Sequence, residues 1–425
     1  MGSASTKSSN RLKVIVATST YPRWPDDEVP TFIRDQLVFF KKYYPCMEIT
    51  ILTPYYPGAN SFEKTDYGDI FRFKYFYPAR YQLLAYPIMP NLKKNKLLYL
   101  QIPFLFLFEF TALFGLVIKR KPDYIYSHWF IPQGIVGGLV GILTKTRHVY
   151  TSHSSDVLIA GRIPVIGPFI VRYITNRAHK VSVVSKRSYA KLRQYFSDEQ
   201  WKKIEDKVRI IPMGINAALF KQTHASKTEL KERFGYAGRN ILLFIGRIVE
   251  KKGIKYILEA LKDYIKTDLS VLMVIAGDGA ATDELKELTR QMQLEEHVDF
   301  VGYTTGNKKQ ELFRICDAVL LPSIITDTGD AEGLPVVLME AMAAGKICIA
   351  TDVSGADDVI ETGKNGFIIE QKSGKALLDA LLLLHGLSQE EKDRMAGNAA
   401  ETSKLFDWKN IVKQHVDHMF NQAKD

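Results

Sequence analysis

The sequence predicts an α/β protein that contains two doubly wound parallel sheets, each in its own domain. The chain has 425 residues, which is more than a single ordinary hydrophobic core organises. Short apolar runs alternate with helical segments along both halves, a pattern typical of buried parallel strands. Between the halves, residues 210–220 contain Pro212 and Gly214, which interrupt regular structure. We therefore place the domain boundary there.

The apolar runs give the expected strands in order. In the first half they are residues 13–17, 48–52, 124–126, 149–150 and 181–184, and in the second half 241–245, 271–276, 298–301, 318–321 and 347–350. We expect a first domain at 1–212, a second at 213–404, and a terminal segment at 405–425. Ligands of open α/β sheets bind at the carboxyl ends of the strands, so functional residues are expected in the loops that follow these runs.

Charge is distributed unequally between the halves. Residues 1–210 contain 31 Lys and Arg against 15 Asp and Glu, a net charge of +16, whereas residues 211–425 contain 26 against 32, or −6. No motif that reads DNA or RNA is present, and the aromatic residues lie mainly in apolar runs, so nucleic acid is not expected as a partner. The basic half favours an anionic membrane surface or a phosphorylated substrate.

The cysteines and the first residues indicate the compartment. Cys46, Cys316 and Cys348 are far apart and form no CxxC or Cys/His cluster, which argues against a disulfide framework and a zinc site. We expect them to be reduced thiols in the core. Residues 1–10 are small and polar and do not resemble a secretory signal. The sequence therefore predicts a cytoplasmic protein.

One apolar segment suggests contact with a membrane. Residues 97–118 contain a single ionisable group, Glu109, and basic residues flank them at 93–96 and 119–121. The segment is long enough to span a bilayer. It nevertheless precedes the expected strand at Tyr124, and a spanning helix would separate that strand from its sheet. We therefore expect a helix that is buried or lies at the membrane surface, with the protein bound to the inner face of the plasma membrane.

The loop after residues 241–245 carries paired cations. It reads Gly246-Arg247-Ile248-Val249-Glu250-Lys251-Lys252-Gly253, and a helical segment follows it. Arg247 and Lys252 can converge on one anion. A diphosphate leaving group gains negative charge as its bond to a sugar breaks, so fixed cations stabilise it most in the transition state. The alternative interpretation is a solvated basic turn.

A second segment, Glu332-Gly333-Leu334-Pro335-Val336-Val337-Leu338-Met339-Glu340-Ala341-Met342-Ala343-Ala344-Gly345, combines two carboxylates with a helix start. Pro335 suits the first helical turn, and Gly333 allows a ligand to approach the backbone. The free N–H groups of the helix end suit a phosphate, while Glu332 can accept hydrogen bonds from sugar hydroxyls. Glu340 can accept them from a ribose diol. The alternative is a surface helix with two solvated glutamates.

This Glu-x7-Glu segment is similar to the motif of the retaining glycosyltransferases of family GT4, also called group 1 glycosyltransferases. The resemblance extends over nearly the whole chain and includes Pro322-Ser323 and Asn365-Gly366-Phe367. It implies the GT-B fold, with two Rossmann-like domains that face each other. It also implies hexosyl transfer from a nucleotide-diphosphate sugar, a UDP- or GDP-sugar. No Asp-x-Asp pair lies at the end of a donor-side strand and two cations already face the diphosphate, so we expect no requirement for a metal or another cofactor.

The resemblance assigns roles to the donor residues. Arg247 and Lys252 would hold the diphosphate, with Gly246, Gly333, Leu334 and Pro335 around the donor, Glu340 on its ribose and Glu332 on the transferred sugar. Arg247, Lys252, Glu332 and His153 are the candidate catalytic residues.

The candidate acceptor side begins after residues 149–150. The stretch Thr151-Ser152-His153-Ser154-Ser155-Asp156 resembles the family's His-Gly-x-Asp element, with Ser154 in place of glycine. The resemblance implies that His153 meets the transferred sugar or the diphosphate. Candidate acceptor-binding residues are Arg23, His128 and Asp156, and Asp156 is also expected to orient nearby loops. A lone histidine at a strand end is more often structural, and His128 can equally be a loop residue packed beside Trp129.

The first loop departs from the family because the common double glycine is absent. Its form, Tyr21-Pro22-Arg23 followed by Pro30-Thr31-Phe32-Ile33-Arg34, resembles a subset associated with bacterial polysaccharide assembly. This implies a polyprenyl-linked or saccharide acceptor in cell-envelope or exopolysaccharide synthesis. Two alternatives remain: a membrane-associated protein that binds nucleotide sugars without turnover, and a dinucleotide-dependent oxidoreductase, against which the absence of GxGxxG after a strand argues.

Overall fold

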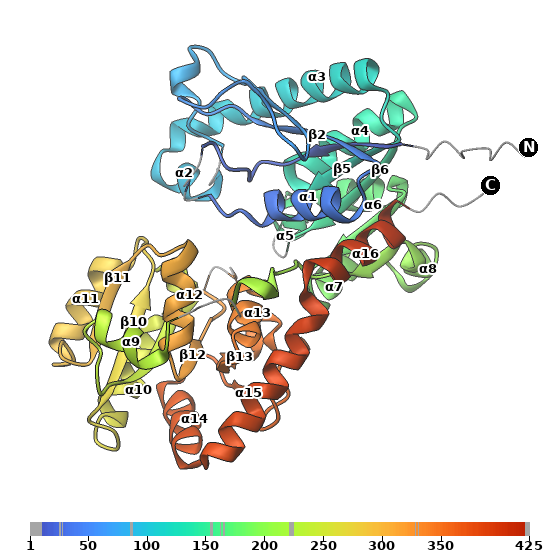
Figure 1. Ribbon diagram of the computed structural model, residues 1–425. Helices are drawn as coiled ribbons and strands as arrows, with labels where there is room; N and C mark the ends of the chain where they lie inside the picture. The colour runs from blue at the N-terminus through green and yellow to red at the C-terminus, as the bar shows by residue number, and fades with distance from the viewer. Residues whose placement is uncertain are drawn as a thin grey trace, which may run out of the picture. The chain divides into compact units, whose positions relative to one another are not determined.

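A computed structural model describes residues 11–24, 27, 29–85, 88–153, 156–161, 163–164, 166–220, 225–327, 329 and 331–420. The chain forms two compact units (Figure 1). One unit comprises Met1–Met213 together with Trp408–Asp425, and the other comprises Gly214–Asp407. The boundary predicted after residue 212 lies one residue before the point, after Met213, where the chain passes from the first unit to the second. Most of the predicted terminal segment, 405–425, belongs to the first unit. The predictions for residues 1–10 and Ser154 concern positions outside the described residues.

The strands of the first unit are β1 (Leu12–Ala17), β2 (Met47–Pro54), β3 (Phe62–Lys64), β4 (Asp69–Phe73), β5 (Tyr124–His128), β6 (Arg147–Ser152), β7 (Lys180–Val183) and β8 (Val208–Ile210). Within the described residues they form one sheet of order β3-β4-β2-β1-β5-β6-β7-β8, parallel except for the antiparallel pair β3 and β4. Five strands lie where apolar runs predicted them. The sequence did not predict β3, β4 and β8, because they are short or carry polar residues at alternate positions.

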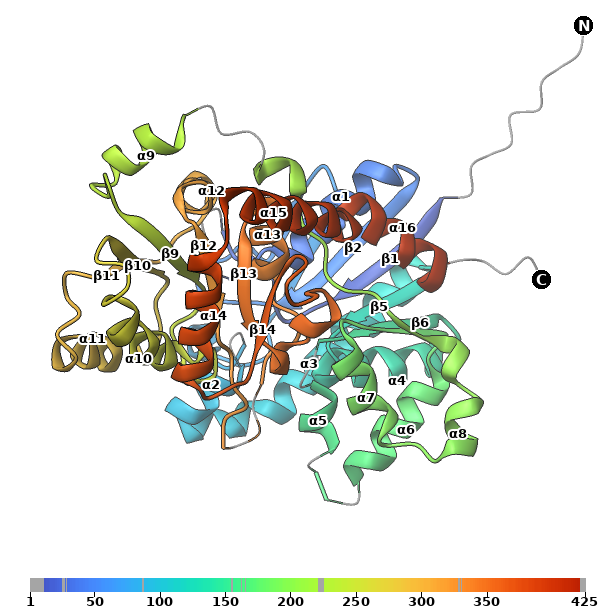
Figure 2. The same ribbon diagram turned by 90° about the horizontal axis from the view of Figure 1, so that it is seen from below.

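The helices and helical turns of the first unit are α1 (Phe32–Tyr43), η1 (Ala79–Tyr81), α2 (Ile88–Lys94), η2 (Lys96–Gln101), α3 (Ile102–Arg120), η3 (Phe130–Gly134), α4 (Ile135–Thr144), α5 (Asp156–Gly161), α6 (Ile166–Arg177), α7 (Lys186–Arg193), α8 (Asp198–Lys202), η4 (Glu205–Lys207) and α16 (Trp408–Met419). Side chains of α3 and α4 pack with Ile15 and Ile125 on one face of the sheet. The other face is covered by α1 and α16, which lie side by side (Figures 1 and 2). There Phe420, just after α16, packs on Tyr124 and Tyr126 of β5.

The strands of the second unit are β9 (Asn240–Ile245), β10 (Val271–Ala276), β11 (Val298–Gly302), β12 (Ala318–Leu321), β13 (Ile347–Thr351) and β14 (Gly366–Ile369). Over the described residues they form a parallel sheet of order β11-β10-β9-β12-β13-β14. Only β14 lies outside the predicted runs. Almost every residue of β9, β10, β12 and β13 is buried, which is why these segments read as continuous apolar runs.

Helices cover both faces of the second sheet. They are η5 (Ala217–Phe220), α9 (Lys227–Arg233), η6 (Glu250–Lys252), α10 (Ile254–Tyr264), α11 (Thr282–Gln291), α12 (Gly306–Ile315), α13 (Val336–Ala343), η7 (Asp352–Ser354), η8 (Ala356–Asp358), α14 (Gly374–Gly386), α15 (Gln389–Ser403) and η9 (Lys404–Phe406). Alternate strand residues pack against α10, α11 and α14 on one face and against α9, α12 and α13 on the other. The unit is therefore doubly wound, as predicted.

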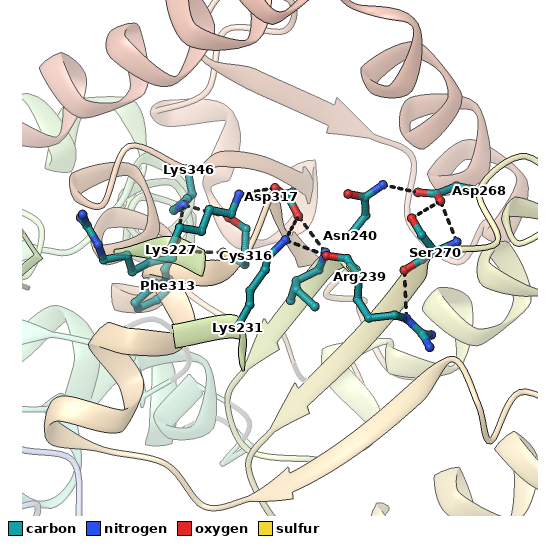
Figure 3. Close-up of polar contacts among 12 residues, drawn as sticks. Lys227, Lys231, Arg239, Asn240, Asp268, Ser270, Phe313, Cys316, Asp317 and Lys346 are labelled. Atoms are coloured by element: carbon teal, nitrogen blue, oxygen red, sulfur yellow. Dashed lines mark hydrogen bonds and ion pairs between the residues drawn. The ribbon is translucent and has the colours of Figure 1, made fainter. Parts of the chain in front are cut away.

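The amino end of the second sheet is held together by a polar network (Figure 3). Asp317, just before β12, accepts hydrogen bonds from the Lys227 ammonium at 2.5 Å and from the backbone N–H of Ile241 at 2.8 Å. Burial raises the pKa of Asp317. The hydrogen bonds and the cation of Lys227 together lower it by more, so the pKa of Asp317 lies below its usual value. Lys346 donates to the carbonyl of Cys316 at 2.8 Å. These contacts connect the starts of strands to the ends of helices, so the amino end of this sheet contributes to the stability of the second unit.

The apolar segment of the first unit is only partly buried. Residues 96–120 form η2 and α3, and the inner stripe of α3, consisting of Leu105, Glu109, Leu113 and Val117, is buried. Large apolar side chains on the outer side are exposed, among them Leu107 at 55% and Phe108 at 42%. By length and composition alone, this helix could cross a membrane. Of the two forms that we expected for this helix, the wholly buried one is therefore wrong. The expectation that all three cysteines are buried is also wrong, because Cys46 is exposed.

Candidate functional site

The carboxyl end of the second sheet carries three closely packed loops. A Cβ on Gly253, whose φ is 64°, would lie 2.0 Å from the carbonyl oxygen of Pro322, which follows β12. A Cβ on Gly277, whose φ is 153°, would lie 1.8 Å from the carbonyl oxygen of Gly246, which follows β9. Only glycine fits these positions without a shift of the backbone. The two glycines thus allow the loops after β9, β10 and β12 to approach one another.

Lys252 and Glu332 form an ion pair at this edge. The Nζ of Lys252 lies 2.5 Å from Oε2 of Glu332, and both side chains are largely buried, with 10% and 13% exposed. A Cβ on Gly246 would lie 3.5 Å from the Lys252 Nζ, so the ammonium stands beside this glycine. Lys252 lies in the protein interior, where its charge is balanced by Glu332. The fold therefore joins two predicted catalytic residues that are 80 positions apart.

Arg247 lies in the same loop and is exposed. Within the described residues, its guanidinium forms no ion pair or hydrogen bond. A surface guanidinium in this position can make bidentate hydrogen bonds to phosphate oxygens.

The segment after Glu332 leads into α13. Gly333 and Leu334 are half-buried, and Pro335 is buried in an extended conformation directly before the first helical residue, Val336. Pro335 thus precedes the first turn and does not form part of it. The backbone N–H groups at the start of α13 lack partners within the helix, which makes this end suitable for an anion.

Glu340 has a partner that the sequence did not suggest. Its Oε2 lies 2.5 Å from the Nζ of Lys309 on α12, and the two side chains are 15% and 24% exposed. The oxygen and the ammonium are close, but their orientation is not that of a hydrogen bond, so Oε2 retains capacity to accept one. Lys309 lies 31 positions before Glu340, and only the packing of α12 next to α13 brings them together. No local pattern around Lys309 marks it.

In the first unit, His153 lies among aromatic rings at the carboxyl end of β6. Its ring centroid is 4.5 Å from that of Trp129, 5.4 Å from that of His128 and 5.6 Å from that of Phe32. Nε2 of His153 is 3.1 Å from Nδ1 of His128, so the two imidazoles share one hydrogen bond. Burial lowers the pKa of His153 to about 3, and it lowers the pKa of His128 well below its usual value, so both rings are neutral at pH 7.

The backbone at Trp129 is strained. Its φ of 70° lies in the left-handed region, which bulky residues rarely adopt. A hydrogen bond from its N–H to the carbonyl oxygen of Thr151, at 3.0 Å, ties this turn to β6. Backbone strain of this kind collects at functional sites. His128, which the sequence also allowed as a packed loop residue beside Trp129, is fully buried beneath this turn.

Asp156 organises the loop around His153. Its carboxylate accepts hydrogen bonds from the backbone N–H of Phe130 at 2.7 Å, from that of His153 at 3.1 Å and from the Ser152 hydroxyl at 2.6 Å. Asp156 is 4% exposed, and burial raises its pKa. Both oxygens are engaged by the protein, and the acceptor-binding role expected for Asp156 stays a prediction. Its expected role in orienting loops agrees with these contacts.

Arg23 is also engaged within the protein. Its guanidinium bonds to both oxygens of Asp27, at 2.5 and 2.8 Å, and lies over the rings of Trp24 and Tyr56. The charge of Arg23, a candidate acceptor-binding residue, is therefore already balanced within the protein. Among the described residues, no group of His, Cys, Asp and Glu is arranged to hold a metal ion.

Two families of known proteins match this chain. Residues 47–219 match the family described as glycosyltransferase family 4, and residues 226–402 match the family described as glycosyl transferases group 1. These matches follow one another along the chain and together include every donor-side candidate, His128, His153 and Asp156. The chain belongs to the group 1 glycosyltransferases of family 4. This family membership contradicts the alternative of a dinucleotide-dependent oxidoreductase.

Curated relatives of this glycosyltransferase carry related names. An uncharacterised glycosyltransferase of Methanocaldococcus jannaschii is 27% identical over 68% of this chain and 73% of its own length. The Escherichia coli glycosyltransferase WcaL, named for colanic acid biosynthesis, is 28% identical over 51% of this chain and 48% of its own length. A Mycobacterium tuberculosis relative, named as a GDP-mannose-dependent phosphatidylinositol monomannoside mannosyltransferase, is 27% identical over 60% of this chain and 66% of its own length.

Solved structures show the same fold. Anabaena HepE, solved with UDP, superposes with a TM-score of 0.69 at 19% identity, over 96% of this chain and 98% of its own. Sucrose-phosphate synthase of Thermosynechococcus elongatus gives a TM-score of 0.74 at 17% identity, with the same coverages. The predicted GT-B fold of this glycosyltransferase, with two parallel-sheet α/β domains, is confirmed.

Proposed function

We propose that this glycosyltransferase moves a hexosyl group from a nucleotide-diphosphate sugar to a saccharide or polyprenyl-linked acceptor, with retention of anomeric configuration and without a metal. The Lys252–Glu332 ion pair beside Arg247 carries the proposal. It joins a cation suited to the diphosphate and a carboxylate suited to a sugar hydroxyl at one strand edge. The names of the relatives support a place in cell-envelope or exopolysaccharide synthesis.

The reaction follows from these groups. The acceptor hydroxyl oxygen forms a bond to the anomeric carbon on the face that the nucleotide leaves, and the bond from this carbon to the phosphate oxygen breaks. The acceptor proton passes to the departing phosphate. Arg247 and Lys252 stabilise the charge that grows on the diphosphate, Glu332 holds a hydroxyl of the transferred sugar, and neutral His153 donates a hydrogen bond to the sugar or the phosphate.

The nucleotide is tested first. Both UDP and GDP are candidates, because a structural neighbour was solved with UDP and a relative is named for GDP-mannose. The chain is titrated with UDP, GDP and ADP while its melting temperature is followed. A ligand at 100 times its dissociation constant adds about 2.7 kcal/mol of stability. Stabilisation by UDP or GDP is expected.

Turnover is tested next with the sugars of the nucleotide that binds. Release of nucleoside diphosphate that depends on the acceptor is expected, and proton NMR of the product should show the anomeric configuration of the donor. Binding without turnover for all sugars would favour the alternative of a non-catalytic, membrane-associated nucleotide-sugar-binding protein. An inverted product, or activity that a chelator removes, would contradict the proposed mechanism.

We also propose that the first unit binds the inner, anionic face of the plasma membrane through α3. Its exposed apolar side chains lie next to basic residues, including Lys119 and Lys121, which are also exposed. Apolar side chains insert among lipids, and each Lys or Arg near an anionic surface adds about 1 kcal/mol of attraction. The expected location is cytoplasmic and peripheral.

Sedimentation with vesicles tests the membrane proposal. Binding to anionic vesicles at low salt and release at high salt are expected, and the variant Leu107→Ser/Phe108→Ser should bind at least tenfold more weakly. Leu383→Ser, a change at an exposed leucine of α14, is the matched control. Retention through high salt and alkaline carbonate would instead indicate a spanning helix. Absence of binding at low salt would oppose the lipid-linked acceptor.

A further inference from the structure

A buried polar cluster lies behind His153, between the first sheet and the helices α1 and α16. It contains Gln36 of α1, His128 of β5 and His415 of α16, none of which has measurable exposure. The ring of Tyr126, two positions before His128 on the same face of β5, links them. Its centroid is 4.4 Å from that of His128 and 6.3 Å from that of His415.

Electrostatic effects place the same residues close together. His415 contributes to the lowered pKa of His128, and His153 contributes to the lowered pKa of His415, although burial is the largest cause for both. The amide of Gln36 acts against the rise in the pKa of Tyr126 that burial causes. The cluster is therefore continuous from the two helices to His153.

The cluster gathers polar atoms that lack protein partners. Within the described part of the chain, Nε2 of His128 and both ring nitrogens of His415 are buried without a hydrogen bond, and the buried amide of Gln36 lies beside the Tyr126 hydroxyl. A buried polar atom without a partner is costly, and such atoms in native proteins are usually satisfied by ordered water. Ordered water shared among Gln36, His128 and His415 would satisfy these atoms.

The hydrogen bond between the histidines depends on this cluster. Only one proton can lie between Nδ1 of His128 and Nε2 of His153, which are 3.1 Å apart. If Nε2 of His128 accepts a hydrogen bond from the cluster, the proton of neutral His128 lies on Nδ1 and is donated to His153. Neutral His153 then carries its own proton on Nδ1. Within the described residues, this nitrogen forms no hydrogen bond, and His153 is partly exposed.

We propose that Gln36, His415 and His128, with shared water, form a positioning relay that holds His153 with its proton on Nδ1, as a hydrogen-bond donor to the sugar or the departing phosphate. The inference rests on the proposed function, because it assumes that His153 contacts the donor. The relay makes α16, at the far end of the chain, part of the machinery of the first unit. Gln36, His128 and His415 are positioning residues, since they act through His153.

The tautomer is tested in the full-length protein by NMR of 15N-labelled histidine, with His153→Gln used to assign the signal. The wild type should show His153 protonated on Nδ1. His415→Leu and Gln36→Leu should shift the signal toward a mixture of tautomers. His153 protonated on Nε2 in the wild type would overturn the proposal. This readout does not depend on turnover, so it separates the relay from the proposed function.

Kinetics test the consequence. His415→Leu and Gln36→Leu should lower kcat at least fivefold, while the Kd of the nucleotide changes less than twofold. His128→Leu should lower kcat further, and His128→Asn, whose amide nitrogen can occupy the place of Nδ1 and donate, should recover much of the loss. His148→Leu is the matched control, because His148 is a buried histidine on the other face of β6, bonded to the Ser127 hydroxyl at 3.1 Å.

The apolar variants also separate a hydrated relay from a dry cluster. If the polar atoms had no water, leucine at position 415 would raise the melting temperature and leave both kcat and the His153 signal unchanged. That result would overturn the relay. His153→Ala could turn over sugar as fast as the wild type while the NMR shifts occur as expected. The proposed contact of His153 with the donor would then be wrong, but the hydrogen-bonded relay would still be supported.

Discussion

The Nζ of Lys252 lies 2.5 Å from Oε2 of Glu332, so the residues assigned to the diphosphate and to the sugar are bonded to each other. Both side chains are largely buried. A change to one therefore alters two things at once: its own contact with the donor, and the balance of a charge that remains in the protein interior. Experiments on either residue need a measurement that separates these effects.

A double-mutant cycle should provide that separation. Lys252→Met and Glu332→Gln are each expected to lower the free energy of unfolding by about 3 kcal/mol, because each leaves a buried charge without its partner. The double variant should lose much less than the sum. Denaturant unfolding of the four proteins gives the coupling energy. The exposed pair Lys266–Asp263 serves as control and should show coupling near zero. Additive losses at Lys252 and Glu332 would mean that the ion pair is not formed in solution.

Arg247 should behave differently from Lys252. Because Arg247 is exposed, Arg247→Ala is expected to leave the melting temperature unchanged. Turnover at saturating donor should fall about 100-fold, since one such donor to a developing charge contributes about 3 kcal/mol. Lys262→Ala, at an exposed cation of α10, is the control. Turnover of Arg247→Ala within twofold of the wild type would remove Arg247 from the diphosphate.

The two glutamates should separate binding from chemistry. Glu340→Gln and Lys309→Met should weaken binding of the free nucleoside diphosphate about tenfold, because they disturb the carboxylate assigned to the ribose. Glu332→Gln should lower kcat without weakening that binding. Isothermal titration with UDP and GDP, together with initial rates, makes the comparison. Glu311→Gln, on α12 and bonded to Arg233, controls for charge loss on that helix. Unchanged nucleotide affinity in Glu340→Gln would contradict the ribose assignment.

Glu109 should make stability depend on pH. Burial raises its pKa to about 8 in the folded protein, against about 4.5 for the free side chain. The folded state therefore binds more protons between these values, and stability contributed by this group falls as pH rises from about 5 to about 8. Replacement by Gln removes the titration. Glu109→Gln should thus gain stability over the wild type as pH rises, by on the order of 1 kcal/mol per pH unit.

Unfolding at pH 5, 7 and 8.5 measures this difference. The exposed change Glu205→Gln, in the same unit, should show no comparable dependence on pH. A constant difference between Glu109→Gln and the wild type across this range would show that Glu109 titrates normally, and hence that it is hydrated in the folded protein.

The sequence by itself determined the fold and predicted the candidate donor residues. The central strands of both sheets are buried on two faces, so they appear in the sequence as continuous apolar runs. Such runs can be recognised without knowing which strands lie beside them. Arg247, Lys252, Glu332 and Glu340 lie in two short segments whose residue types already suit a diphosphate and a sugar. Edge strands such as β3 and β8 were missed, because few of their side chains are buried and the apolar signal is correspondingly weak.

Only the tertiary structure decided which residues meet. Lys309 with Glu340, and Gln36 and His415 with His128, are far apart in the chain and lie on helices whose local sequence marks no function. The structure likewise gives Arg23 and Asp156 partners that the sequence did not suggest: Asp27 for Arg23, and the backbone N–H groups of Phe130 and His153 for Asp156. A local pattern specifies the chemistry of a side chain, whereas its hydration, its protonation and its partner depend on the elements packed around it.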